Sequence, residues 1–105
     1  MSKYSSLILI VDKPLFTKES LQTYKVLEGQ SLNISLNASG NPPQIEYKWS
    51  LPVANSLDIR AEGPRLRLSK ARRSFRGNYT VRAWNGYGNF NTTVTIFVDI
   101  QYAPR

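Results

Sequence analysis

Tyr79-Thr80-Val81-Arg82-Ala83 alternates apolar and polar side chains with a period of two. Segments 32–36, 65–68 and 94–98 alternate in the same way. Because successive side chains of a β-strand point to opposite faces, this pattern is typical of strands that bury one face. No segment carries a helical stripe of apolar residues over three turns.

Turn-forming residues separate these runs, as short connections between antiparallel strands require. They are Glu28-Gly29, Ser39-Gly40-Asn41-Pro42-Pro43, Glu62-Gly63-Pro64 and Asn85-Gly86-Tyr87-Gly88. An antiparallel sheet with one apolar face buries that face by stacking on a second sheet. The sequence therefore predicts an all-β fold, an antiparallel β-sandwich of two sheets.

The composition argues against an enzyme. The 105 residues are enough for one domain with its own core. They include no histidine and no cysteine, which excludes Ser-His-Asp and Cys-His catalysis, thiol redox chemistry and an ordinary structural zinc site. The seven carboxylates are scattered, without the spacing of a calcium-binding loop. We therefore expect no catalytic residue, no cofactor and no metal.

The two ends of the chain are similar to each other. Residues 5–12 align with residues 92–99, and a proline follows each segment within a few residues. One interpretation is that the chain begins with the last strand of a similar, preceding domain in a tandem array. The other is that any two β-rich strands led by serine or threonine would align as well.

From about Pro14 to its end, the chain resembles immunoglobulin-like domains of the intermediate (I-set) kind. The motifs that carry the resemblance, in family order, are Val26-Leu27-Glu28-Gly29-Gln30-Ser31-Leu32 before strand B, Gly40-Asn41-Pro42-Pro43 as the B–C turn, Trp49, Leu66-Arg67-Leu68 in strand E, Gly77-Asn78-Tyr79-Thr80-Val81 in strand F, and the F–G hairpin at 83–88. The resemblance implies a Greek-key sandwich of seven to nine strands at residues 14–101. It implies an interdomain linker at 102–105, similar to those of nephrin- and siglec-type receptors, and the end of a preceding domain or a linker at 1–13.

The resemblance also implies how the core is built. Trp49 stands where the family keeps a tryptophan buried between the sheets, and Tyr79 where it buries a ring whose hydroxyl bonds to the backbone before strand F. The family joins strands B and F by a disulfide, whose two positions here are Leu36 and Val81. The core therefore lacks a crosslink worth about 2–4 kcal/mol. Phe75 replaces an aspartate that often makes an ion pair beneath strand F.

Two signals about the cellular compartment conflict. A chain without cysteine is typical of a reducing compartment, and immunoglobulin domains of giant intracellular muscle proteins are poor in cysteine. Against this stand four N-glycosylation motifs, where about one would arise by chance. Their acceptors are Asn33, Asn37, Asn78 and Asn91. Because strand alternation points the first three toward solvent, the motifs favour an extracellular domain.

The candidate partner site is the exposed face of strands C, F and G. Alternation along strand F points Arg82 and Trp84 outward, and it places Phe97 and Lys48 on the same face. Solvent-facing aromatic rings beside arginine are typical of binding hot spots. We therefore predict these four residues as partner-binding, with Trp84 and Phe97 as neighbours. The alternative is that Trp84 covers only its own hairpin, or is covered by a neighbouring domain.

Arginines form a second candidate site, although an ordinary solvated surface is the preferred explanation for them. Two lie on the outward side of strand E and three in the following turn: Arg65, Arg67, Arg72, Arg73 and Arg76. Since the net charge is +7, such a cluster would attract a sulfated glycan or an anionic headgroup. We expect no nucleic-acid partner, because no recognition helix, aromatic RNA-binding strand motif or Gly-x-x-Gly clamp is visible.

These expectations together favour a non-catalytic adhesion or recognition module of a multidomain receptor on the extracellular face of the cell membrane. Its partner would be an ectodomain, either a second copy or a different one, or a neighbouring immunoglobulin domain. The domain itself is not expected to enter the membrane, because its longest apolar run, Leu7 to Val11, is far too short. The alternatives are an intracellular structural module of a muscle-type protein and a passive spacer.

Overall fold

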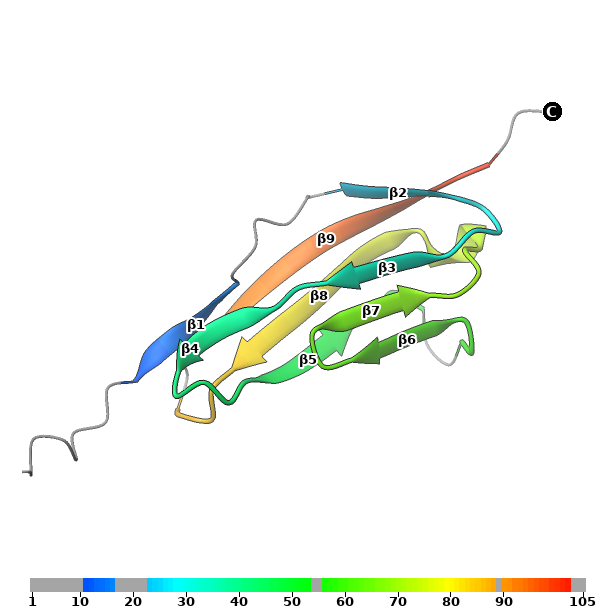
Figure 1. The fold of residues 1–105 in the computed structure, drawn as a ribbon. Helices are drawn as coiled ribbons and strands as arrows, with labels where there is room; N and C mark the ends of the chain where they lie inside the picture. The colour runs from blue at the N-terminus through cyan, green and yellow to red at the C-terminus, as the bar shows by residue number, and fades with distance from the viewer. Residues whose placement is uncertain (1–10, 17–22, 54–55, 89, 103–105) are drawn as a thin grey trace, which may run out of the picture.

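The computed structural model describes residues 11–16, 23–53, 56–88 and 90–102. This part of the chain forms nine strands and one short 3-10 turn, labelled as in Figure 1. The elements are β1 (Asp12–Phe16), β2 (Thr23–Leu27), β3 (Leu32–Ser35), β4 (Ala38–Asn41), β5 (Glu46–Ser50), β6 (Ile59–Glu62), β7 (Arg65–Leu68), η2 (Arg73–Phe75), β8 (Gly77–Trp84) and β9 (Asn91–Gln101).

The strands form a sandwich with two main layers. One sheet has the order β2-β9-β8-β5 and the other β3-β7-β6, and β1 pairs with β4 separately. Figure 1 shows β3, β7 and β6 in front of β9, β8 and β5. All pairs are antiparallel except β2 with β9, which is parallel. The predicted all-β sandwich is confirmed, with a small third pair of strands added to the two sheets.

The alternation read from the sequence produces the core. Along β8 the side chains of Tyr79, Val81 and Ala83 are buried, while Arg82 between them is exposed. Residues of both sheets join one apolar cluster: Val26, Ile34, Leu36, Ile59, Leu66, Leu68, Ala71, Phe75, Tyr79, Val81, Ile96, Val98 and Ile100. Burying this surface is the main force that holds the two layers together.

The positions that would hold the intersheet disulfide are filled by apolar side chains, as predicted. Leu36 is 2% exposed and Val81 is 0% exposed. Phe75 is also buried, and its carbonyl oxygen accepts a hydrogen bond from the Tyr79 hydroxyl at 2.5 Å. The predicted role of Tyr79 in the corner before β8 is therefore confirmed. Burial raises the pKa of this hydroxyl from 10.0 to about 12.

The prediction of a fully buried Trp49 is wrong in degree. The indole packs against the core cluster but stays half-exposed. Its Nε1 donates a hydrogen bond to the Gly63 carbonyl oxygen, in the turn between β6 and β7, at 2.8 Å. Because β5 is at the edge of its sheet, Trp49 covers the open side of the sandwich instead of its centre.

The stretch predicted as a long turn before strand C is partly a strand. Residues 38–41 form β4, where Leu15 of β1 lies opposite Ser39. A Cβ atom on Gly40 would lie 3.3 Å from both Pro14 and Ile45, so the missing side chain allows β1 to approach closely. Local turn propensity is overridden here by pairing with a strand that is distant in the sequence.

Several predictions fall on residues outside the described ranges. The N-terminal segment of the internal similarity, residues 5–12, lies almost wholly in the undescribed residues 1–10. Residues 103–105 of the predicted linker are also undescribed. The tandem-array interpretation therefore stays a prediction.

Candidate functional site

The β5–β8–β9 face is the outer surface of the larger sheet, where the sequence predicted a partner site. Cross-strand pairing brings together its outward side chains: Glu46, Lys48, Ser50, Thr80, Arg82, Trp84, Asn91, Thr93 and Thr95. Lys48 and Arg82 are exposed and Trp84 is half-buried. The outward orientation predicted for these three residues is confirmed, whereas their role in binding stays a prediction.

Two cations lie side by side at the centre of this face. Lys48 of β5 is directly opposite Arg82 of β8, an arrangement that costs free energy because like charges repel across neighbouring strands. They line a shallow hollow of about 280 Å³ together with the hydroxyl side chains of Ser50, Thr80 and Thr93. A partner carboxylate placed there would meet two positive charges and several hydrogen-bond donors.

Trp84 ends β8 at the hairpin that leads into β9. Its Nε1 donates a hydrogen bond to the Gly88 carbonyl oxygen at 3.0 Å, so the indole fixes the hairpin as well as facing outward. The same hairpin exposes Tyr87 and Phe90, by 42% and 39%. The sequence analysis did not identify these two exposed rings. Their position in a turn rich in Gly and Asn was the available signal, because a side chain in such a turn rarely reaches the core.

Asn85 locks this hairpin against the first strand. The side chain is only 5% exposed, and its Nδ2 donates to the Asp12 carbonyl oxygen at 2.7 Å. Its Oδ1 accepts from the Tyr87 backbone N–H at 3.1 Å, and Gly86 adopts a φ of 90°, which favours glycine. No local signal predicts the contact with Asp12, because 73 residues separate the two positions. These two hydrogen bonds connect the start of the hairpin to β1 and fix the turn at Tyr87.

The prediction that Trp84 and Phe97 are neighbours is wrong. Trp84 is paired with Asn91, and Phe97 is paired with Asn78 at the other end of the β8–β9 ladder. Six residues of strand span about 20 Å. Alternation alone gives the face on which a side chain lies, but not the register between strands, and the register separates these two rings.

Phe97 is covered by an arginine instead of being free for a partner. The Arg76 guanidinium lies 5.0 Å from the centroid of the Phe97 ring. The Nε of Arg76 also donates to the Asp99 carboxylate at 3.1 Å. Since Asp99 follows two residues after Phe97 on β9, the three side chains form one cluster, at a distance from Lys48 and Arg82.

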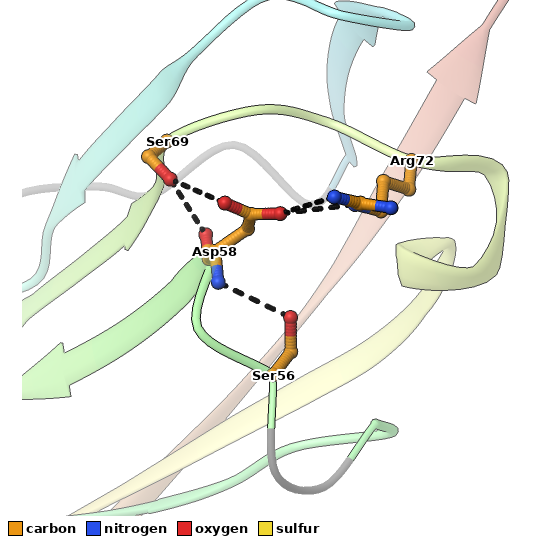
Figure 2. Close-up of polar contacts among 4 residues, drawn as sticks. All are labelled: Ser56, Asp58, Ser69 and Arg72. Carbon is orange, nitrogen blue, oxygen red and sulfur yellow. Dashed lines mark hydrogen bonds and ion pairs between the residues drawn. The ribbon is translucent and has the colours of Figure 1, made fainter.

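Arg72 is held by a carboxylate that bridges two loops. Figure 2 shows Asp58 accepting hydrogen bonds from Arg72 and Ser69, while its backbone N–H donates to Ser56. The ion pair of Arg72 with Asp58 measures 2.8 Å, and the Ser69 hydroxyl lies 3.1 Å from Oδ1 of Asp58. Asp58 therefore ties the segment before β6 to the segment after β7.

Arg73 is held in a similar way near the C-terminal end. Its Nε lies 3.2 Å from a carboxylate oxygen of Glu28, and its guanidinium lies 4.0 Å from the centroid of the Tyr102 ring. All three arginines of the turn after β7, Arg72, Arg73 and Arg76, thus have an acidic partner. Three arginines of the predicted polyanion site are therefore paired with carboxylates, and binding of a polyanion by the five arginines stays a prediction. Arg65 and Arg67 lie apart, on the outer face of β7.

The four predicted glycosylation acceptors are spread over the molecule: Asn33 on β3, Asn37 between β3 and β4, Asn78 on β8 and Asn91 on β9. Asn33, Asn37 and Asn78 are exposed, as predicted, and Asn91 is half-buried beside Trp84. An exposed asparagine in the Asn-x-Ser/Thr pattern is sterically accessible to the transfer of a glycan. Use of these acceptors stays a prediction.

The described residues hold no group of three or more acidic side chains placed to bind a metal ion. No helix in the described ranges is long and apolar enough to cross a membrane.

Comparison with known proteins connects this geometry to one family. The family model described as "Immunoglobulin domain" matches residues 13–85. Sialic acid-binding Ig-like lectin 6 of Homo sapiens is 30% identical over 81 residues, which cover 76% of this chain and 18% of that protein. Titin of Drosophila melanogaster is 32% identical over 83 residues, 77% of this chain and a share of titin that rounds to 0%. The chain therefore spans less than a fifth of either relative.

A solved structure shows the same fold. The structure of titin domain M7 superimposes with a TM-score of 0.69 at 19% sequence identity, and the match covers 88% of this chain and 97% of that domain. Similarity at this level of identity concerns the fold alone. The solved structure therefore agrees with the sandwich fold.

Proposed function

The chain belongs to the immunoglobulin domain family, and we propose that it is a non-catalytic recognition module that binds a protein through the β5–β8–β9 face. On this proposal it is one domain of a larger receptor on the extracellular face of the cell membrane. The partner is another ectodomain, either a second copy of this chain or a different protein.

The observation that carries the proposal is the exposed pair of Lys48 and Arg82 beside Trp84. The two cations face each other across β5 and β8, and Trp84 follows two residues after Arg82. Water solvates the pair in the free domain, and an acidic partner would remove their mutual repulsion. The hydrogen bonds of Trp84 to Gly88 and of Tyr87 to Asn85 hold these two residues in place in the free domain, which lowers the entropy cost of ordering them in a complex.

The extracellular location rests on the exposed glycosylation motifs. Three acceptors are exposed, Asn33, Asn37 and Asn78. Similarity to a sialic acid-binding Ig-like lectin supports the same location, although this chain covers only 18% of that protein. Secretion from eukaryotic cells followed by mass spectrometry of the intact protein would show glycan on at least one acceptor. A fully unmodified secreted product would contradict the extracellular assignment.

An intracellular structural module is the second candidate. The cysteine-free core and the 32% identity to titin favour it. Such a module would need no ligand at the β5–β8–β9 face, as would a passive spacer. Sulfated glycans are not part of the protein-binding proposal, because Arg65 and Arg67 lie on the opposite sheet.

Beads coated with the domain test the proposal. Their self-aggregation, and their binding to suspended cells whose sulfated glycans have been removed enzymatically, would be compared for wild type, Lys48→Glu with Arg82→Glu, and Trp84→Ala. The control is Arg65→Glu with Arg67→Glu, which makes the same change in net charge on the other sheet. We expect the variants of the β5–β8–β9 face to lose binding while the control retains it. Equal binding by all folded variants would leave the spacer as the better description.

A further inference from the structure

The arginines of the smaller sheet differ from those of the turn after β7, which are paired with carboxylates. Arg72, Arg73 and Arg76 each have a carboxylate partner, at 2.8, 3.2 and 3.1 Å. None of the ion pairs found among the described residues involves the arginines of the smaller sheet. Those are Arg60, Arg65 and Arg67, and all three are exposed. Unpaired positive charge is therefore concentrated on the β3–β7–β6 sheet.

Strand register brings these three cations together. Arg60 of β6 is directly opposite Arg67 of β7, and Arg65 lies two residues before Arg67 on the same side of β7. Directly paired residues are about 5 Å apart and alternate residues about 7 Å apart. All three positions thus lie within about one Debye length, roughly 8 Å in physiological salt. Glu62, opposite Arg65, is the one acidic side chain among these paired positions.

The surface between the arginines is hollowed. Asn33 and Ser35 of β3 are opposite Arg67 and Arg65, and their short side chains form the floor beside the long arginines. The resulting hollow has a volume of about 290 Å³, and the polar side chains that line it are Asn33, Ser35, Arg60, Glu62, Arg65 and Arg67. A sulfate group placed there would meet guanidinium, amide and hydroxyl donors.

We propose that this basic face, the outer surface of β3, β7 and β6, binds a sulfated polysaccharide. The outward residues of these strands include no aromatic ring, although stacking on aromatic rings is how proteins hold single-stranded nucleic acid. They also include no apolar side chain to insert into a membrane. A linear chain of sulfates is held by spaced guanidinium groups along an open surface, and the three arginines around the hollow supply them.

Asn33 gives the site a means of control. It is the acceptor of the motif Asn33-Ile34-Ser35 and is directly opposite Arg67, so a glycan attached there would cover the hollow. Glycosylation of Asn33 and polysaccharide binding therefore exclude each other. The binding form of the domain is the one without a glycan at this position.

Binding of a heparin-derived octasaccharide to unglycosylated protein in 0.15 M salt tests the site. Replacing Arg60→Gln, Arg65→Gln and Arg67→Gln together removes three charges from the basic face. The control, Lys25→Gln, Lys48→Gln and Arg82→Gln, removes three charges from the larger sheet. We expect the first variant to bind on the order of a hundredfold more weakly, and the control to change only a few-fold.

Equal losses in both triple variants would show binding by net charge alone and would overturn the proposal, as would no loss in either. A desulfated octasaccharide should not bind. Single-stranded DNA or phosphatidylserine vesicles that bind the basic face more tightly than the octasaccharide would reassign it to those partners. If the triple variant is unfolded by circular dichroism, the single variants Arg65→Gln and Arg67→Gln decide, each with a loss of about fivefold expected.

Blocking of the site by a glycan at Asn33 can be tested without relying on cellular glycosylation. Because the chain has no cysteine, Asn33→Cys gives a unique thiol to which a maleimide-linked oligosaccharide can be attached. The conjugate should bind the octasaccharide at least tenfold more weakly than the unconjugated variant. The same conjugate at Asn78→Cys, on the opposite sheet, should bind normally. Unchanged binding of the Asn33 conjugate would show that a glycan at Asn33 does not block the site. The proposal that the three arginines bind the polysaccharide would not be affected.

Discussion

The Tyr79 hydroxyl donates a hydrogen bond to the Phe75 carbonyl oxygen, and this bond closes the corner through which the chain enters β8. Both residues belong to the core cluster, at 0% and 2% exposure. The hydroxyl therefore satisfies a carbonyl group that has little access to water. The corner also fixes η2, from which Arg73 reaches Glu28, and the residue that follows η2, Arg76, reaches Asp99.

Replacing Tyr79→Phe should lower the free energy of unfolding at neutral pH by about 1–2 kcal/mol, because the Phe75 carbonyl loses its donor. The pKa of Tyr79 is about 12 in the folded state and about 10 in the unfolded chain. A raised folded-state pKa means that its contribution is complete below pH 10 and is lost as the pH rises toward 12.

Urea denaturation at several pH values measures this effect. Two pKa units correspond to about 2–3 kcal/mol, so the stability difference between wild type and Tyr79→Phe should shrink or reverse by pH 12. Tyr87→Phe, at an exposed ring, is the control and should follow the wild-type curve. A difference that stays constant between pH 9 and 12 would show that Tyr79 ionises as easily when folded as when unfolded.

Substituting Leu36→Cys together with Val81→Cys should restore an intersheet disulfide. Both side chains are buried in the same core cluster, and a bridge between them should raise the free energy of unfolding by about 2–4 kcal/mol. Free-thiol titration and denaturation with and without reductant measure the effect. Two thiols that remain free in air would show that the α-carbons are too far apart, beyond about 7 Å.

The substitution Trp49→Ala should cost about 2–3 kcal/mol, less than a fully buried tryptophan would, because the indole is half-exposed. Trp49→Phe keeps much of the packing but removes the hydrogen bond to Gly63, and it should cost about 1 kcal/mol. Chemical denaturation gives both values. Equal midpoints for wild type and Trp49→Ala would show that the ring contributes nothing to the sandwich.

Replacing Asp58→Ala should destabilise the domain by about 1–2 kcal/mol, since it breaks contacts to both Ser69 and Arg72. The matched control is Asp99→Ala, which removes a single exposed ion pair with Arg76 and should cost less than about 1 kcal/mol. Thermal unfolding of the two variants compares them directly. A larger loss at Asp99 would contradict the role of Asp58 as the bridge between the two loops.

The sequence predicted features that depend on local pattern and missed those that depend on register or distant contacts. Alternation along residues 79–83 correctly gave the buried side of β8, and therefore the outward side chain of Arg82. It could not show that Phe97 is paired with Asn78, because a period of two is unchanged when one strand slides past the other.

The arginines show the same limit. Five of them lie close together in the sequence, yet carboxylates from three separate segments, before β6, after β2 and in β9, pair with Arg72, Arg73 and Arg76. Arg60, which lies outside the predicted cluster, joins Arg67 through strand pairing. Sequence spacing alone therefore included three arginines that are paired with carboxylates and left out Arg60 of β6.

Folding of this domain requires no oxidant, because Leu36 and Val81 fill the core where an intersheet disulfide would otherwise lie. Its yield and stability should therefore be independent of the ratio of reduced to oxidised glutathione, and of any disulfide isomerase. The same sequence can reach the same fold on the ribosome in the cytosol or in the endoplasmic reticulum. When fused to a domain that does carry disulfides, this domain should stay folded under reducing conditions that unfold its neighbour.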